Sequence, residues 1–206
     1  MAGGTKEKLI ADLVRGGYLK RPIIIEAFQN IDRKDFVPLN IVGEAYVNEP
    51  LPIGYGQTIS QPLTVAFMLE LLDPREGELV LDVGSGSGWQ TALLSYCVGG
   101  VSVKKGMLGI ELQKKPNVEH GRVTAIERIP ELAKMTEENL RKYGFVESGI
   151  SEVILGDGAR GPVERAPFDK IVAAASAEEI PKFWKENLKV GGRIVAPIGH
   201  GIFEIR

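Results

Sequence analysis

The chain has 206 residues, of which 44% are hydrophobic and 25% are charged, and its formal net charge is −2 at pH 7. This length suits one globular domain, or one domain with a small cap. The near-neutral charge gives no electrostatic reason to expect nucleic acid or a membrane surface as a partner. No charged-then-apolar leader and no apolar run of about twenty residues is present, so we expect a cytoplasmic protein.

The N-terminal part of the chain is expected to be mainly helical. Short amphipathic helices are predicted over residues 6–14 and 22–31. Residues 37–57 are rich in proline and glycine, which is typical of irregular structure or short edge strands. A further helix is predicted over residues 61–72, and the Asp-Pro-Arg-Glu-Gly turn signal at residues 73–77 follows it.

Strands and helices alternate after that turn. Strands are predicted over residues 79–83, 122–127, 152–155, 170–174 and 193–197, and helices over residues 89–98, 131–143 and 181–188. This alternation predicts an α/β fold, a Rossmann-like doubly wound and mostly parallel sheet with helices on both faces. We expect one compact unit with a helical cap over residues 1–77 and a cofactor-binding domain over residues 78–206.

The most informative segment is a glycine-rich turn after the first predicted strand. Its candidate ligand-binding residues are Asp82, Gly84, Ser85, Gly86 and Gly88. Glycines let the backbone turn sharply and approach a ligand closely. A strand, such a turn and a helix form the nucleotide-binding corner of a doubly wound sheet. The G-x-G-x-G spacing differs from the G-x-G-x-x-G of dinucleotide folds, which disfavours a dehydrogenase. The alternative is a turn that only packs the helix on the strand.

Acidic residues follow the second and third predicted strands, where ligands of such sheets bind. Glu127, followed by Arg128, is placed to accept hydrogen bonds from two ribose hydroxyls. Asp157, followed by Gly158, is placed to accept one from an exocyclic amine such as adenine N6. The alternatives are a solvated acid at a helix start for Glu127 and an ordinary turn residue for Asp157.

The link over residues 99–121 is long and contains several lysines, for which we expect a solvated turn. Its segment 107–111 mimics the end of a second strand, and Glu111 lies nearer than Glu127 to the usual spacing of a ribose acid, about 20 residues. We prefer Glu127, because Arg128 and a helix start follow it. Glu111 is then expected to belong to an inserted hairpin.

Four blocks resemble the protein-L-isoaspartate (D-aspartate) O-methyltransferase family, whose members are class I S-adenosylmethionine-dependent methyltransferases. The blocks are residues 52–62 (Pro-Ile-Gly-Tyr-Gly-Gln-Thr-Ile-Ser-Gln-Pro), 82–88, 125–132 and 156–199. They occur in the expected order over most of the chain. The first block distinguishes this family from other methyltransferases, whereas the glycine turn is shared by many of them.

The resemblance implies a repair enzyme that methylates the α-carboxylate of L-isoaspartyl residues in damaged proteins and peptides. S-adenosyl-L-methionine is the implied cofactor and S-adenosyl-L-homocysteine the product. Ser60 is the implied catalytic residue, which donates a hydrogen bond near the reacting carboxylate; its alternative is a helix N-cap. Gln57, Thr58, Ile59 and Ser60 are implied to contact the cofactor. A carboxylate is already ionised at neutral pH, so no catalytic histidine and no metal is expected.

The end of the chain departs from the family pattern. The family usually carries a final antiparallel hairpin after the fifth strand, and residues 201–206 can supply one strand of it and no return strand. Two other hypotheses therefore stay open: a class I methyltransferase for another acceptor, and a truncated cofactor-binding module without turnover. In each case we expect a monomer.

Overall fold

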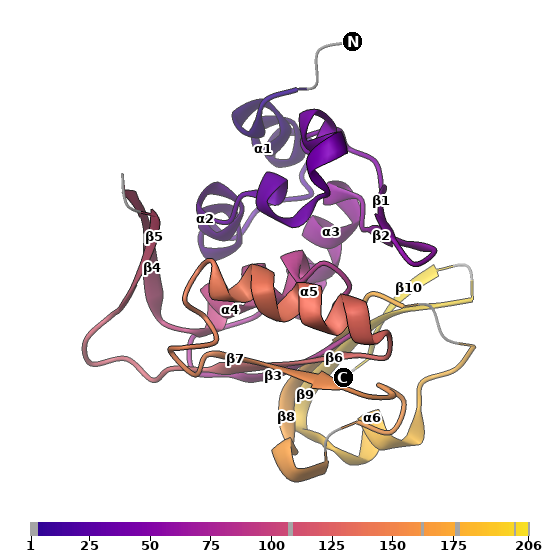
Figure 1. Cartoon of the computed structure of the whole chain (residues 1–206). Helices are drawn as coiled ribbons and strands as arrows, with labels where there is room; N and C mark the ends of the chain where they lie inside the picture. The colour runs from indigo at the N-terminus through magenta and orange to yellow at the C-terminus, as the bar shows by residue number, and fades with distance from the viewer. Residues whose placement is uncertain (1–3, 107–108, 162, 176–177, 200, 206) are drawn as a thin grey trace.

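A central six-stranded sheet carries helices on both faces, with a cap of helices beyond one of them (Figure 1). The computed structural model describes residues 4–106, 109–161, 163–175, 178–199 and 201–205. Within these ranges, none of the helices has the length and apolarity that a membrane crossing requires. The predicted doubly wound, mostly parallel α/β fold is confirmed.

The cap follows the prediction closely. Its helices are α1 (Lys6–Arg15), α2 (Pro22–Asn30) and α3 (Pro62–Leu72). Between α2 and α3 lie two 3-10 turns and a small hairpin, formed by Arg33–Phe36, Leu39–Glu44, β1 (Leu51–Gly54) and β2 (Gln57–Ile59). The short strands expected in this proline- and glycine-rich stretch are thus present. The predicted boundary after residue 77 stays a prediction and lies in the turn that follows α3.

The sheet contains the five predicted strands and one more. They are β3 (Leu79–Val83), β6 (Arg122–Glu127), β7 (Ser151–Leu155), β8 (Phe168–Ala173), β9 (Leu188–Ile198) and β10 (Gly201–Ile205). Their order is β10-β9-β8-β3-β6-β7, and all neighbours are parallel except β10 and β9. β10 lies at the sheet edge, as expected for a single strand after the fifth.

Helices cover both faces of this sheet. They are α4 (Trp89–Val98), α5 (Pro130–Arg141), α6 (Lys182–Glu186) and a 3-10 turn at Val163–Arg165. α4 and α5 lie on the cap side and α6 on the other (Figure 1). Side chains alternate between the two faces along each strand. Accordingly Val80 of β3 packs in the cap-side core, whereas its neighbour Leu81 packs in the smaller core with Trp184 of α6.

The prediction was least accurate around α6 and β9. The predicted helix over residues 181–188 is only five residues long, and β9 begins at Leu188 and runs for 11 residues. Gly191 and Gly192 weaken the strand signal within β9, because glycine is depleted in strands. In the structure Gly192 fills a place without room for a side chain, since a Cβ would lie 2.7 Å from the carbonyl oxygen of Asp169.

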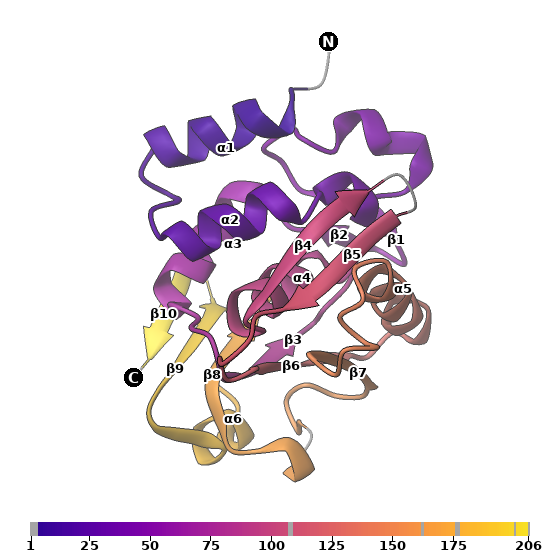
Figure 2. The same ribbon diagram turned by 90° about the vertical axis from the view of Figure 1, so that its left-hand side faces the viewer.

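The long link after α4 forms the predicted inserted hairpin. Its strands are β4 (Val101–Gly106) and β5 (Gly109–Lys114), which pair only with each other among the described residues. The hairpin rises from the level of the sheet toward the cap and covers one side of α4 (Figure 1 and Figure 2). Met107 and Leu108, part of the segment that mimics a strand end, lie outside the described residues.

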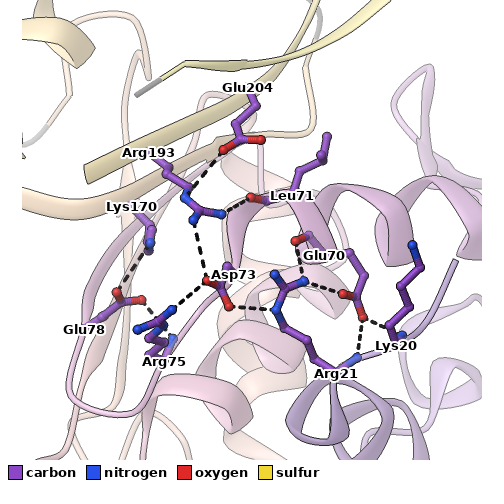
Figure 3. A network of polar contacts seen from close by, with 10 residues as sticks. All are labelled: Lys20, Arg21, Glu70, Leu71, Asp73, Arg75, Glu78, Lys170, Arg193 and Glu204. Atoms are coloured by element: carbon purple, nitrogen blue, oxygen red, sulfur yellow. Dashed lines mark hydrogen bonds and ion pairs between the residues drawn. The ribbon is translucent and has the colours of Figure 1, made fainter. Parts of the chain in front are cut away.

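A polar network joins the cap to the edge of the sheet (Figure 3). At its centre, Asp73 ends α3 with a left-handed backbone (φ 54°). Its carboxylate forms ion pairs with Arg21 at 2.8 Å, Arg75 at 3.0 Å and Arg193 of β9 at 3.6 Å. Arg193 also lies 3.5 Å from Glu204 of β10. The network therefore links the segment before α2, the end of α3 and the two last strands.

The charge of Asp73 is expected to stabilise the fold. Burial raises the pKa of Asp73, but the hydrogen bond from Arg75 and the charges of Arg21, Arg75 and Arg193 outweigh it and lower the pKa overall. The stabilisation is present above the ordinary pKa of aspartate and is lost as the pH falls through the lowered value. Asp73→Asn should lower the free energy of unfolding by roughly 1–3 kcal/mol at neutral pH, measured by urea denaturation.

That difference between wild type and Asp73→Asn should shrink as the pH is lowered below about 4. The control is Asp12→Asn, which removes an exposed ion pair with Arg15. This control should change the free energy of unfolding by less than about 1 kcal/mol. Equal losses in the two variants, or a loss for Asp73→Asn that does not depend on pH, contradict the role of the network.

Candidate active site

A cavity of about 380 Å³ lies at the carboxyl ends of β3, β6 and β7. This is the edge at which doubly wound sheets bind their ligands. Most of the predicted site residues line it, namely Gln57, Thr58, Ile59, Ser60, Gly84, Ser85, Gly86, Glu127, Arg128, Asp157 and Gly158. Two predicted residues, Asp82 and Gly88, do not, and Glu111 on the inserted hairpin does not either.

The glycine turn approaches the cavity with its backbone. Gly84 and Gly86 both have left-handed backbones, with φ of 79° and 57°. Gly84 donates a hydrogen bond from its N–H to the carbonyl oxygen of Ile126 at 2.8 Å, and the N–H of Gly86 donates to Oε2 of Glu127 at 3.0 Å. The turn after β3 is thereby tied to the end of β6, its neighbour in the sheet.

Gly88 lies at a helix contact and outside the cavity lining. It is the N-cap of α4 and has a left-handed backbone, with φ of 85°. A Cβ on Gly88 would lie 3.2 Å from the Cα and the carbonyl oxygen of Thr136 on α5. The glycine therefore lets the start of α4 pack closely against α5, and its predicted cofactor contact stays a prediction.

Asp82 lies beneath the turn and is fully buried. Its Oδ1 accepts a hydrogen bond from Nε2 of Gln90 at 2.9 Å, and its Oδ2 accepts one from Oγ1 of Thr91 at 2.6 Å. Both partners belong to the first turn of α4. The carboxylate therefore holds the start of α4 against β3, and the predicted direct contact with the cofactor stays a prediction.

Glu127 is positioned by backbone hydrogen bonds and is 6% exposed. Its Oε1 accepts hydrogen bonds from the N–H groups of Arg128 at 2.9 Å and Ile129 at 3.0 Å, while Oε2 accepts from Gly86. A carboxylate oxygen has two lone pairs, so Oε2 retains capacity for a ligand hydroxyl. The burial excludes the alternative of a solvated acid at a helix start.

Asp157 and Gly158 form the far wall of the cavity. Oδ1 of Asp157 accepts a hydrogen bond from the N–H of Ala159 at 3.0 Å, so the residue also has the turn role named as its alternative. The carbonyl oxygen of Gly158 accepts one from Nε1 of Trp184 at 2.8 Å. A Cβ on Gly158 would lie 2.3 Å from Cγ1 of Val83, so only glycine fits here.

Ser60 lines the opposite side of the cavity, where the chain enters α3. The N-cap of α3 is Gln61, whose side chain makes no capping hydrogen bond, and the N–H of Leu63 instead donates to Oδ1 of Asn48 at 2.9 Å. The alternative of Ser60 as a helix cap is therefore wrong. Ser60 thus lines the cavity on the segment that carries the family-specific block.

Two aromatic residues of the site were not predicted from the sequence. Trp89 and Trp184, each 2% exposed, are the two tryptophans of the chain, and both line the cavity. The position of Trp89, directly after the glycine turn, is a signal that could have identified it. Trp184 carries no such signal, because only the packing of α6 beneath the sheet brings it to Gly158.

The buried charge of Asp82 predicts a pH effect on stability. Burial raises the pKa of Asp82 to about 6, although hydrogen bonds from Thr91 and Gln90 act in the opposite direction. The folded state therefore holds a proton that the unfolded state has released, and stability falls as the pH rises from about 4 to about 6. Asp82→Asn keeps the shape and removes the titration.

In urea unfolding, wild type should lose roughly 2–3 kcal/mol relative to Asp82→Asn between about pH 4 and pH 7. A difference between the two proteins that stays constant over this range contradicts the raised pKa.

Residues 4–205 match the family model of protein-L-isoaspartate(D-aspartate) O-methyltransferase. A curated protein-L-isoaspartate O-methyltransferase of Aeropyrum pernix is 44% identical and is matched over 93% of this chain and 66% of its own length. One of Staphylothermus marinus is 40% identical, with 94% of this chain and 79% of its own length matched. The chain thus spans slightly less than two thirds of the first relative and more of the second.

Solved structures of similar proteins show the same relationship. A protein-L-isoaspartate O-methyltransferase superposes with a TM-score of 0.74 at 28% identity, over 94% of this chain and 55% of its own. A beta-aspartate methyltransferase from Plasmodium falciparum, in complex with S-adenosyl-L-homocysteine, has a TM-score of 0.80 at 22% identity, over 98% of this chain and 89% of its own, and shares the fold. The predicted family, fold and methyltransferase class are confirmed. The chain belongs to the protein-L-isoaspartate(D-aspartate) O-methyltransferase family.

Proposed function

We propose that this chain transfers the methyl group of S-adenosyl-L-methionine to the α-carboxylate of L-isoaspartyl residues in damaged proteins and peptides. The observation that carries the proposal is the shared cavity. Residues 57–60, from the family-specific block, line the same cavity as the glycine turn and the acids after β6 and β7. Donor and acceptor can therefore meet within one cavity, as direct transfer requires.

The residues around the cavity fit S-adenosyl-L-methionine, which supplies an activated methyl group when bound. Gly84 and Gly86 leave room beside the backbone for its amino acid and ribose. Glu127 is proposed to accept hydrogen bonds from the ribose hydroxyls through its buried carboxylate. Asp157 is proposed to accept one from the adenine amine, with Trp184 forming an apolar wall behind Gly158.

Methyl transfer to a carboxylate needs little acid–base catalysis by the protein. The acceptor carboxylate is ionised at neutral pH and is already a nucleophile. Ser60 is proposed to donate a hydrogen bond to this carboxylate and so to hold it in line with the methyl group. The buried side chains of Ile59 and Trp89 exclude water from the same region. Positioning of this kind can contribute roughly 7–11 kcal/mol to catalysis.

The location, oligomeric state and partners of the enzyme are also proposals. We expect a cytoplasmic monomer whose partners are isoaspartyl-containing proteins and peptides and which binds neither nucleic acid nor membranes. The only cysteine of the chain, Cys97, is buried on α4, and burial raises the pKa of its thiol. A free and unreactive thiol suits a reducing compartment. Light scattering on the purified protein measures the oligomeric state directly.

The proposed activity is tested with a matched pair of peptides, one with isoaspartate and one with aspartate at the same position. Each is incubated with methyl-labelled S-adenosyl-L-methionine. Base-labile label on the isoaspartyl peptide alone supports the proposal. Label on neither peptide contradicts it, and a titration with S-adenosyl-L-homocysteine then separates a binding module from a protein that does not bind this cofactor.

Ser60→Ala should lower kcat by roughly 10–100-fold, because it removes a hydrogen bond to a charged group. The affinity for S-adenosyl-L-homocysteine, measured by calorimetry, should stay nearly unchanged. Ser60→Thr is the control, since it keeps the hydroxyl. Wild-type turnover in Ser60→Ala removes the proposed role of this hydroxyl.

Asp157→Ala should weaken the binding of S-adenosyl-L-homocysteine by about 10-fold, the value of one lost hydrogen bond. Arg160→Ala is the matched control. It removes the exposed cation that lies 3.7 Å from Asp157 but keeps the carboxylate. Calorimetry that gives wild-type affinity for Asp157→Ala, or the same loss for both variants, rejects the adenine contact.

A further inference from the structure

We propose that Arg33 is a positioning residue, whose buried guanidinium sets the path of the backbone that carries Ser60. Arg33 lies in the 3-10 turn after α2, outside the cavity lining and 27 positions before Ser60. This inference rests on the proposed function, because it concerns the acceptor side of the same cavity.

The guanidinium of Arg33 binds four backbone carbonyl oxygens on the way to the cavity. Its Nη1 donates to the carbonyl oxygens of Ala45 at 2.8 Å and Val47 at 3.3 Å. Its Nη2 donates to those of Glu49 at 3.0 Å and Ser60 at 3.1 Å. One planar group therefore holds both ends of the segment over residues 45–60.

Arg33 also contacts the first residue of α4. The guanidinium carbon of Arg33 lies 5.3 Å from the ring centroid of Trp89, a cation–π arrangement. Trp89 directly follows the glycine turn, lines the cavity and also makes a T-shaped contact with Phe28, with ring centroids 5.4 Å apart. Arg33 thus touches the acceptor segment and the donor side of the site at once.

Among the described residues, the positive charge of Arg33 is compensated only by the four carbonyl oxygens and the ring of Trp89. The residue is 2% exposed, and in the described part of the chain it forms no ion pair. Burial lowers the pKa of Arg33 to about 10, so the guanidinium is still charged at neutral pH. A buried charge is costly unless its donors are matched; the two Nη atoms of the planar fork are matched by four carbonyl oxygens, as an ammonium could not be, while Nε has no hydrogen-bond partner among the described residues. The segment must therefore follow the path on which these carbonyls converge.

The position of Arg33 should affect where the acceptor carboxylate is held. The carbonyl bound by Nη2 belongs to Ser60 itself, so a shift of the guanidinium moves the residue proposed to hold the carboxylate. A displacement of about 1 Å at a reacting group can cost roughly 100-fold in rate. On the cofactor side Arg33 contacts Trp89, where a lysine keeps the positive charge, and it makes no hydrogen bond to Glu127 or Asp157, so the affinity for S-adenosyl-L-homocysteine should change little.

The test compares Arg33→Lys with Arg193→Lys. Arg193 is a matched control, because its side chain is only 18% exposed and also binds a backbone carbonyl, that of Leu71 at 2.8 Å, but lies in the network of Figure 3 rather than beside Ser60. Both variants should lower the melting temperature. Only Arg33→Lys should lower kcat for the isoaspartyl peptide, by at least about 10-fold, with the affinity for S-adenosyl-L-homocysteine within about twofold of wild type.

A second measurement tests the role of Arg33 independently of the proposed function. Amide hydrogen exchange over residues 45–60 should rise in Arg33→Lys and not in Arg193→Lys, whether or not the wild type turns over any peptide. If Arg33→Lys does not fold, Arg33→Gln replaces it, since the neutral amide removes the cost of the buried charge. Wild-type kcat in the Arg33 variant, equal losses in both variants, or unchanged exchange over residues 45–60 overturns the proposal. An inactive wild type counts against the proposed function alone.

Discussion

Two buried carboxylates hold the glycine turn, and the rest of the site depends on them. Asp82 binds the first turn of α4 from below, and Glu127 binds the N–H of Gly86 from the neighbouring strand. Because β3 and β6 are adjacent and parallel, the two acids end up on either side of the same turn. The backbone between them is thereby kept at the edge of the sheet, where a ligand can approach it closely.

The edge of the sheet forms one wall of the cavity, and the cap forms a second wall. Residues 57–60 come from the small hairpin and the entrance to α3, and they face the glycine turn. The polar network around Asp73 joins the end of α3 to β9, and Arg33 joins the hairpin segment to α4. The network around Asp73 fixes the cap on the sheet away from the cavity, whereas Arg33 fixes the wall of the cavity that carries Ser60.

Local patterns predicted the elements well wherever a strand or helix has a clear period and a clear end. The strand before the glycine turn and the helix after it have the predicted bounds, as does β6. The prediction was weaker at β9, where two glycines interrupt the strand, and at Gly88, where the reason for a glycine is a helix on another part of the chain. Ser60 lies at a helix start in sequence, but Asn48 supplies the cap in space.

The sequence by itself determined the fold class, the family and 11 of the 25 residues that line the cavity, because strand ends, glycine spacing and the block over residues 52–62 are local signals. Only the tertiary structure decided which of those residues face a ligand. Asp82 and Glu127 look alike in sequence as acids at strand ends, yet one lies beneath the turn and the other at the cavity. The roles of Arg33 and Trp184 depend on contacts between distant segments, which no local pattern encodes.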